Sequence, residues 1–454
     1  MKKFAILLMA FVVTMLGVTI PAFALTEGDW EFKLLNDEVT VTKYIGKDTH
    51  IVVPSTIYGA PVTKVGDTYG ILGDTDVVSL TLPNTVKEID KLAWFADELE
   101  TVILPEGIEV IPRFCFNGSK KLKSVSLPST IKRIEGKAFS DCRELSDIII
   151  PAALEYIGEE AFKSTALTKV DFSPAINLNL ENCGEYIFYS ADKLKEVKLP
   201  PSTTAVPSRC FIYCKALEKV DFNGAPVRAI KYSAFGECVS LKSIILPATL
   251  KIIDDFAFSE TGLEEVVIPY GVEKIDGLAF CNCKSLKSLY IPDTAEIERG
   301  LFQGCPNAIA FCGDGSKAAE VCKKNEISYL TDNSVNSGIT VLYNGTRISF
   351  HKYNQNPDLI NSRTLVPLRS IFEAMGADVQ WIEDTSTVIA TRKGVKITLQ
   401  IGSNKVVKNN ESITIDTPPM LINDRTMVPV RVIAEAFGAN VSWNDDGKTV
   451  IINE

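Results

Sequence analysis

Histidine is almost absent from this sequence. Only His50 and His351 occur among 454 residues, and they lie far apart in the chain. Nucleophilic triads and most sites of general acid–base catalysis use a histidine. The phosphate-binding pattern G-x-x-x-x-G-K-[ST] and the zinc-peptidase pattern H-E-x-x-H are missing as well. The sequence therefore predicts a protein that is not an enzyme, with no catalytic and no cofactor-binding residues.

An excess of basic residues is also lacking. The chain has 47 lysines and arginines against 57 aspartates and glutamates, which gives a formal net charge of −10. Proteins that bind nucleic acid usually carry a basic patch or stripe, and no such stretch is present. Adjacent carboxylates such as Glu159–Glu160 and Asp254–Asp255 point to opposite faces of a strand, so they indicate solvated surface. We therefore expect no nucleic acid among the partners.

Only one long apolar run occurs, and it lies at the start of the chain. Lys2 and Lys3 precede the apolar stretch 4–20, and Ala22-Phe23-Ala24 follows it as a cleavage site. This pattern is typical of a secretory signal peptide at 1–24; an uncleaved membrane anchor is the alternative. No apolar tail or sorting motif closes the chain. We expect a secreted, extracellular or cell-surface associated protein with no transmembrane anchor after cleavage.

Cysteine is present in an odd number, 11, so not all can pair within one chain. Five of them recur three residues after a phenylalanine: Cys142, Cys214, Cys238, Cys283 and Cys305. Ser119, Thr165 and Thr261 occupy the same slot elsewhere, which indicates a small buried group that donates weakly to a turn carbonyl. A zinc site would need a second C-x₂₋₄-C pair, so no metal is expected. A disulfide between Cys312 and Cys322 stays open because the chain is expected to be exported.

A tandem repeat, L-x-x-V-x-L-P-x-x-I-x-x-I-x-x-x-A-F-x-x-C, runs from Val77 to Cys305. Its leading leucines recur every 22–24 residues, with one longer step of 27 where 176–186 forms an expected loop. Each unit contains a short alternating run, such as 125–127, 148–150 or 244–246, which predicts a strand that the following proline ends. One such unit cannot bury its own apolar face, whereas stacked units can. The repeat therefore predicts a β-rich solenoid.

This pattern resembles the leucine-rich repeats of the BspA-like (LRR_5) class found in bacterial and protozoan surface proteins. Cys115 and Cys210 depart from it, because they stand where the repeat usually has alanine. The resemblance implies an N-terminal cap at 25–76 and an array at 77–330 that ends in a C-terminal cap. A helix starting after Ser316 is expected in that C-terminal cap. The linker 331–338 would follow.

The strands of the array expose one residue each, midway between two inward-pointing neighbours. Because adjacent strands lie about 4.8 Å apart, these residues form a regular column. Apolar side chains on such a surface often mark an interaction site. The alternative is that they are ordinary strand formers covered by lysine and glutamate stems. The predicted partner-binding residues are Ile103, Ile149, Ile245, Val267 and Tyr290.

The tail, 339–454, contains an internal duplication. The stretch 359–369 returns at 421–431 with an offset of 62, and Trp381 returns as Trp443. Pro367 and Pro429 suit the first turn of a helix, and Gly376 and Gly438 suit its end. Strands are expected after each helix. The tail is therefore predicted to be a small α+β domain made of two duplicated helix–hairpin units.

The repeated motif R-T-x-V-P-x-R resembles the copper amine oxidase N-terminal-like domain, the stalk module of secreted proteins in Gram-positive-type bacteria. The resemblance implies a noncatalytic appendage, and two histidines cannot build the three-histidine copper site of the oxidase. Arg369 with Glu373, and Arg431 with Glu435, are expected to be structural ion pairs. Trp381 and Trp443 are expected in the core, with a carbohydrate-binding surface as the alternative.

These observations predict an exported binding protein whose array presents a surface to protein or glycan partners outside the cell, in an adhesion-like role. The alternative is a structural protein of the cell envelope. In that case the stalk-like tail binds cell-wall polymer and the array is a spacer. The two differ in which part of the chain carries the binding activity.

Overall fold

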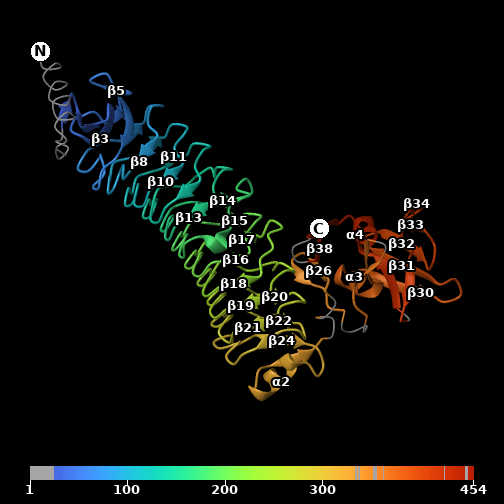
Figure 1. Ribbon diagram of the computed structural model, residues 1–454. Helices are drawn as coiled ribbons and strands as arrows, with labels where there is room; N and C mark the ends of the chain where they lie inside the picture. The colour runs from blue at the N-terminus through green and yellow to red at the C-terminus, as the bar shows by residue number, and fades with distance from the viewer. Residues whose placement is uncertain are drawn as a thin grey trace, which may run out of the picture. The chain divides into compact units, whose positions relative to one another are not determined.

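The computed structural model describes residues 25–332, 335, 338–350, 355–360, 362–423, 425–444 and 448–454 (Figure 1). The predicted signal peptide 1–24, His351 and part of the predicted linker lie outside the described residues. The chain divides into two compact units. The first ends at Leu217 and includes Ala234–Cys238, and the second comprises Glu218–Ser233 and Val239–Glu454.

The first unit begins with antiparallel hairpins in the region that was expected to form the N-terminal cap. Strands β1 (Leu25–Glu27), β2 (Trp30–Leu35) and β3 (Glu38–Tyr44) are antiparallel, and β3 then pairs in parallel with β6 (Ala60–Val65). Strand β5 (Thr56–Ile57) forms a hairpin with β6, which also pairs with β8 (Glu88–Ile89). Phe32, Val39 and Val41 are fully buried. The apolar residues that alternate along β3 therefore cover the end of the apolar core.

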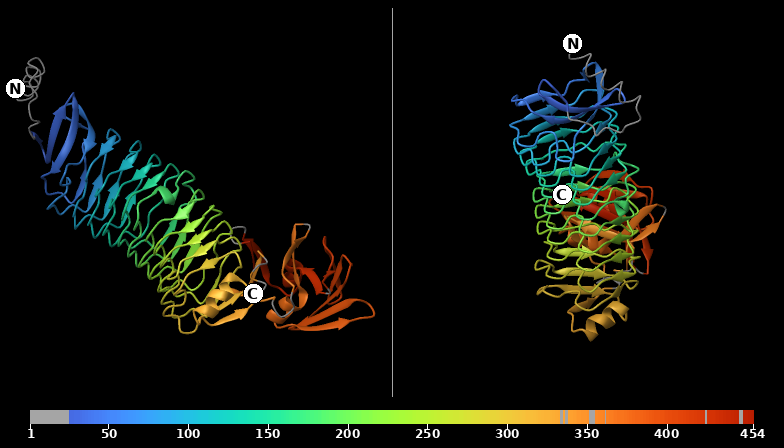
Figure 2. Two further views of the ribbon diagram at one scale, coloured as in Figure 1. Left: turned by 60° about the horizontal axis from the view of Figure 1, so that its bottom comes forward. Right: turned by 60° about the vertical axis from the view of Figure 1, so that its left-hand side comes forward.

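Short parallel strands from successive coils follow, and they pair position for position. One sheet contains β4 (His50–Val52), β7 (Ser79–Thr81), β9 (Thr101–Ile103) and β11 (Ser124–Ser126). A second contains β10 (Val110–Ile111), β12 (Arg133–Ile134) and β13 (Tyr156–Ile157), and β14 (Lys169–Asp171) pairs with β15 (Glu196–Lys198). The register places Ile51, Leu80, Val102 and Val125 side by side in the core. Figure 2 shows the strands of successive coils lying next to one another. Strand β16 (Ala205–Val206) and the 3₁₀ turn η1 (Leu180–Asn182) complete this unit, and η1 lies in the predicted loop.

The second unit continues the repeat in the same way. Strands β18 (Ala229–Ile230), β19 (Ile252–Ile253), β21 (Lys274–Ile275) and β23 (Glu296–Ile297) form one parallel sheet. Strands β20 (Glu265–Val267), β22 (Ser288–Ile291), β24 (Ile309–Cys312) and β25 (Tyr329–Thr331) form another, and β17 (Lys219–Asp221) also belongs to this unit. Helix α2 (Lys317–Lys324) follows, and the Ser316 hydroxyl accepts a hydrogen bond from the Ala319 N–H at 3.1 Å. The predicted helix and its N-cap are confirmed.

Two of the predicted strands do not form. Residues 148–150 and 244–246 belong to no strand, although Ile148 and Ile150 are buried and Ile149 points outward. Period-two alternation reports which side chains are buried, and it does not require the ladder hydrogen bonds that define a strand. The prediction of strands was therefore wrong at these two coils, while the predicted alternation of burial around Ile149 holds.

Phenylalanine rings fill the centre of the first unit. Phe116, Phe139, Phe162, Phe188, Phe211 and Phe235 stack in chain order with ring centroids 5.3–5.5 Å apart. All six are fully buried. Each ring comes from the Ala-Phe position of one coil or its equivalent, so the spacing of the coils sets the spacing of the rings. This column is the continuous core that stacking of the repeat requires.

The cysteine slot lies beside the phenylalanine column. The thiol of Cys142 donates to the Phe116 carbonyl at 3.1 Å, and that of Cys238 to the Phe211 carbonyl at 3.2 Å. The Ser119 hydroxyl donates to the Ala93 carbonyl at 2.6 Å and that of Thr165 to the Phe162 carbonyl at 2.9 Å. The prediction of a small buried donor to a turn carbonyl is confirmed. Because no water reaches the slot, burial raises the pKa of the Cys142 and Cys238 thiols.

Gly184 marks a point where the backbones of adjacent coils touch. A Cβ atom there would lie 2.1 Å from the Glu159 nitrogen and 2.5 Å from its Cα. We expect Gly184→Ala to lower the free energy of unfolding by about 3 kcal/mol, because a backbone contact cannot give way as a flexible side chain can. Gly271→Ala is the control, since its nearest neighbours would be 3.8 Å away. Urea unfolding followed by circular dichroism measures both, and equal stabilities of the two variants would contradict the prediction.

The tail has its own core between two helices and three sheets. The sheets run in the orders β27-β26-β38-β37, β28-β29-β36-β35 and β30-β31-β32-β33-β34. Their strands are β26 (Thr340–Tyr343), β27 (Thr346–Arg347), β28 (Asp358–Ile360), β29 (Arg363–Pro367), β30 (Asp378–Ile382), β31 (Thr387–Arg392), β32 (Val395–Gln400), β33 (Lys405–Lys408), β34 (Glu411–Thr414), β35 (Met420–Ile422), β36 (Arg425–Pro429), β37 (Asn440–Asn444) and β38 (Thr449–Asn453). Val341, Val366, Phe372, Ile433 and Ile452 are among the residues of the core.

Helices α3 (Leu368–Ala374) and α4 (Val430–Ala436) begin directly after Pro367 and Pro429, one position later than predicted. Each is followed by Gly376 or Gly438 with φ of +70° or +91°, a conformation that ends a helix at little cost only for glycine. An antiparallel strand pair follows each helix, β30–β31 and β37–β38. In the part of the chain that the structure describes, no helix is long and apolar enough to cross a bilayer.

Candidate functional site

The outward column of the first unit contains exposed apolar residues. The side chains of Val52, Ile103 and Ile149 are 66, 53 and 81% exposed. The inward-pointing residues of the neighbouring strand positions, Leu80, Val102 and Val125, are buried. Ile103 pairs in register with Ser126, so polar residues separate the apolar ones along the column. Exposed aliphatic side chains that alternate with polar ones at regular spacing suit contact with an extended partner.

The second unit presents this column differently. Ile245 and Val267 are half-buried, and Tyr290 is only 7% exposed. The Tyr290 ring stacks on Phe311 with centroids 4.7 Å apart, and the guanidinium carbon of Arg347 lies 4.3 Å from its centroid. The expectation that Tyr290 is an exposed surface residue was therefore wrong. Arg347 lies in β27, far along the sequence, and nothing in the repeat itself indicates this contact.

Arg347 also belongs to a buried ion pair. Its Nη1 lies 3.2 Å from Oδ2 of Asp332, and both side chains are 2% exposed. Its backbone N–H donates to Oε1 of Glu265 at 2.8 Å. Charges that are removed from water need partners of this kind. These contacts explain why Tyr290 is shielded from solvent.

Neither a metal cluster nor a disulfide appears among the described residues. No three histidine, cysteine, aspartate or glutamate side chains are grouped there so as to hold a metal ion. All eleven cysteines are free thiols, including the buried Cys312 and Cys322. A hydrogen bond to Cys312 and burial raise the pKa of the Cys322 thiol, and the same bond lowers that of Cys312.

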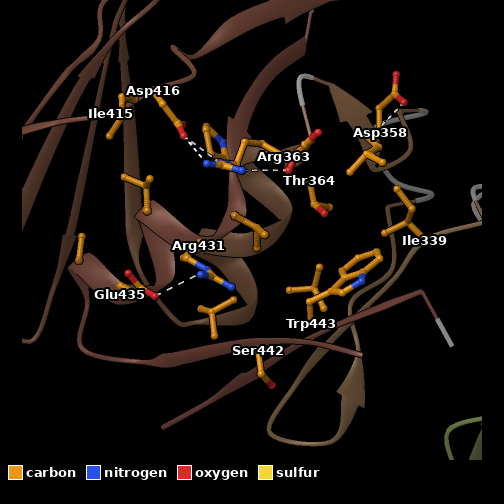
Figure 3. Close-up of a pocket in the computed structure, with 18 of the residues that line it drawn as sticks. Ile339, Asp358, Arg363, Thr364, Ile415, Asp416, Arg431, Glu435, Ser442 and Trp443 are labelled. Carbon is orange, nitrogen blue, oxygen red and sulfur yellow. Dashed lines mark hydrogen bonds and ion pairs between the residues drawn. The ribbon is translucent and has the colours of Figure 1, made fainter. Parts of the chain in front are cut away.

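A large cleft of the tail lies beside helix α4 and has a volume of about 1200 Å³. Its walls come from β28, the start of β29, β34, α4 and β37. The side chains of Arg363, Arg431 and Trp443 lie around it (Figure 3). Strand β34 is the last strand of its sheet, and all four of its residues are exposed. The cleft thus combines an aromatic side chain, charged groups and an open strand edge.

Two ion pairs stand at the walls of this cleft. Nε of Arg363 donates to Oδ2 of Asp416 at 2.9 Å, and this hydrogen bond lowers the pKa of the Asp416 carboxyl. Nε of Arg431 lies 3.9 Å from Oε1 of Glu435, so the predicted i,i+4 pair of α4 is confirmed. All four side chains are at least half exposed. Such pairs add little stability and keep their polar atoms available to a ligand.

Trp381 and Trp443 are 40 and 36% exposed. The expectation that both are core residues was wrong, because each lies on the first strand of its hairpin, β30 or β37, at the edge of a sheet. Only Trp443 is among the residues that line the large cleft. The two tryptophans occupy equivalent positions of the duplicated sequence but have different surroundings in the folded tail.

Helix α3 borders a smaller cavity of about 330 Å³, with Ser370, Glu373 and Ala374 on its wall. The residues of α4 at the offset of 62 are Val432, Glu435 and Ala436, and all three line the large cleft. The same helix face therefore lines a cavity in both copies. In the second copy the cavity is larger and also includes Trp443.

Comparisons with known proteins agree with the two parts of the sequence. The BspA type leucine rich repeat region matches residues 71–183 and 181–309, in 6 copies. The copper amine oxidase N-terminal domain matches residues 342–452. That domain is not the catalytic domain of the oxidase, and leucine-rich repeat proteins are generally noncatalytic.

Two solved structures of bacterial proteins are similar to parts of this chain. A leucine-rich repeat protein from Bacteroides ovatus is 19% identical, with a TM-score of 0.52 over 71% of this chain and 82% of that one. A leucine rich cell surface protein from Faecalibacterium prausnitzii is 21% identical, with a TM-score of 0.36 over 68% of this chain and 99% of that one. The first similarity supports a β-rich leucine-rich-repeat solenoid with few helices.

A protease inhibitor from Brevibacillus choshinensis is 30% identical over 90 residues. The match spans 20% of this chain and 28% of that relative. It is a local similarity that leaves most of both chains unmatched. The repeat model, in contrast, covers more than half of this chain. The chain therefore belongs to the family of BspA type leucine rich repeat proteins, and it carries a copper amine oxidase N-terminal domain as its tail.

Proposed function

We propose that the protein is an exported, noncatalytic binding protein that acts outside the cell or at its surface. Its array, 77–330, presents the outward strand column to a protein or glycan partner. The observation that carries this proposal is the exposure of Ile103 and Ile149 on the array, with Val52 of the N-terminal cap at the same outward position. Exposure of an aliphatic side chain to water is unfavourable, so a partner that covers the side chain gains binding free energy.

The test uses the full-length protein with two aspartates in the column, Ile103→Asp and Ile149→Asp. Val239→Asp is the matched control, because Val239 is a 50% exposed aliphatic residue that lies outside every strand. The proteins are applied to an array of purified extracellular-matrix proteins and glycans. We expect wild type to bind at least one of them and the column variant to bind it about tenfold more weakly, as loss of an interface anchor predicts. No binding by wild type, or equal losses in both variants, would refute the proposal.

A second role is favoured by the tail. We infer that 339–454 is a stalk module of two duplicated helix–hairpin units that retains the protein on cell-wall polymer. The open cleft beside α4, with an aromatic side chain and two arginines on its walls, supports this role. Cosedimentation of the full-length protein with isolated cell walls tests it. If the protein stays in the supernatant, the wall-retention role is refuted and the protein is interpreted as a freely secreted binding protein.

A further inference from the structure

The cleft beside α4 has a composition that selects among ligand classes. Its walls carry the cations Arg363, Lys408, Arg431 and Lys448 and the anions Asp358, Asp416 and Glu435. The charges nearly balance, and the ion pairs Arg363–Asp416 and Arg431–Glu435 satisfy much of them. A highly charged ligand of either sign would therefore meet as much repulsion as attraction.

The same walls are rich in groups that suit hydroxyl and amide ligands. Arginine offers planar N–H donors, and carboxylates that face a guanidinium still have free lone pairs. Ser362, Thr364, Thr414 and Ser442 add hydroxyls to the lining. A ligand with many alternating donors and acceptors can use these groups without displacing the ion pairs. Sugars have this character.

Trp443 adds a flat apolar surface. Its side chain is 36% exposed, and Ile413 and Leu359, also on the lining, are 37 and 56% exposed. The ring of a β-linked pyranose presents C–H groups on its faces, and the flat face of an indole can cover them. A cleft of about 1200 Å³ has room for more than one sugar, because small-molecule pockets of 300–1,000 Å³ already hold drug-sized ligands.

We propose that this cleft is a glycan-binding site, in which Trp443 covers the apolar face of a β-linked N-acetylated sugar chain and Arg363 and Arg431, with their carboxylates, bond its hydroxyl and acetamido groups. The proposal deepens the wall-retention role of the tail and rests on it for the source of the glycan. It assigns the ligand to one side of the tail. It also distinguishes residues that the sequence presents as equivalent.

The duplication supplies matched controls for each residue. Trp381, Arg369 and Arg425 stand at the offset of 62 from Trp443, Arg431 and Arg363. None of the three lines the cleft. Trp381 and Trp443 lie at the same position of their hairpins, opposite Val388 and Val450, and have similar exposure. Truncating either tryptophan should therefore perturb folding to a similar extent, and only one should change binding.

The experiment titrates the full-length protein with chitohexaose, the β-1,4-linked hexamer of N-acetylglucosamine, by isothermal calorimetry. We expect Trp443→Ala to weaken binding at least about tenfold and Trp381→Ala to leave it within about twofold. Arg363→Gln should weaken binding more than Arg425→Gln does. Thermal unfolding of all variants shows whether each is folded, and Trp443→Phe should retain much of the affinity because an aromatic face remains.

Three results would overturn the assignment. They are no heat of binding with wild type, equal effects of the Trp443 and Trp381 variants, and competition by the pentapeptide stem of peptidoglycan alone, which would make the ligand a peptide. Cell-wall cosedimentation separates the two proposals. If wild type and Trp443→Ala both pellet, wall retention stands and the cleft assignment falls. If chitohexaose binding depends on Trp443 and nothing pellets, the cleft stands and wall retention falls.

Discussion

The first unit of the array is expected to unfold as the pH rises from about 8 to about 10. Five of its thiols are fully buried, and burial raises the pKa of each: Cys115, Cys142, Cys210, Cys214 and Cys238. In the unfolded chain a thiol has a pKa of about 8.5. Above that pH the unfolded state releases these protons while the folded state keeps them. The unfolded state then binds fewer protons, so stability falls with pH by about 1.4 kcal/mol per thiol and pH unit.

Five thiols together remove about 7 kcal/mol per pH unit, which is comparable to the total stability of a typical domain, about 5–15 kcal/mol. Circular dichroism during a pH titration in the presence of a reductant measures the midpoint. The control is the double variant Cys142→Ser, Cys238→Thr, which uses residues that occupy the same slot in other coils. Its midpoint should move to higher pH. An unchanged midpoint would mean that tyrosines or lysines, which both proteins share, cause the transition.

Removal of one ring from the phenylalanine column is expected to have the largest effect of any single substitution in the first unit. Phe162 is fully buried between Phe139 and Phe188, with ring centroids 5.5 and 5.4 Å away. We expect Phe162→Ala to lower the free energy of unfolding by about 3–5 kcal/mol. The two neighbouring rings lose contacts on one side, and the backbone hydrogen bonds between coils prevent collapse of the cavity. Urea unfolding measures the loss.

Ile149→Ala is the control for this substitution. Ile149 is large, aliphatic and 81% exposed, so its truncation should change stability by less than about 0.5 kcal/mol. A loss below about 1 kcal/mol for Phe162→Ala would show that the column is loosely packed. Parallel loss of structure throughout the array would show that its coils unfold together, as nearest-neighbour coupling between repeats predicts.

The repeat allowed the internal side of the array to be predicted well. The Ala-Phe position, the Cys/Ser/Thr slot and the alternating strand residues recur along the array with few substitutions, and each coil repeats the surroundings of the one before. Recurrence therefore reveals which positions face the core. The failures at 148–150 and 244–246 concern backbone hydrogen bonds, which depend on how two coils are oriented and leave no mark on the apolar pattern.

The surface was harder to predict because its surroundings are not periodic. Tyr290 occupies an outward repeat position, but Arg347 covers it, and a contact between distant residues has no signature in a local pattern. Trp381 and Trp443 occupy equivalent positions of the duplicated sequence, and only the folded tail shows that one of them lines the cleft. In the tail, proline and glycine indicated the ends of the two helices to within one residue, because these residues act through local backbone geometry.

The cysteine slot constrains how the chain must fold in an oxidising environment. Oxidants and other disulfides react with accessible thiolates, and the buried, neutral thiols of the native protein offer almost none. The unfolded chain, in contrast, exposes eleven thiols. Burial must therefore outpace oxidation each time a chain folds, since a wrong disulfide between coils would block their stacking. Rapid local closure of each coil against its neighbour would then protect the protein chemically as well as stabilise it.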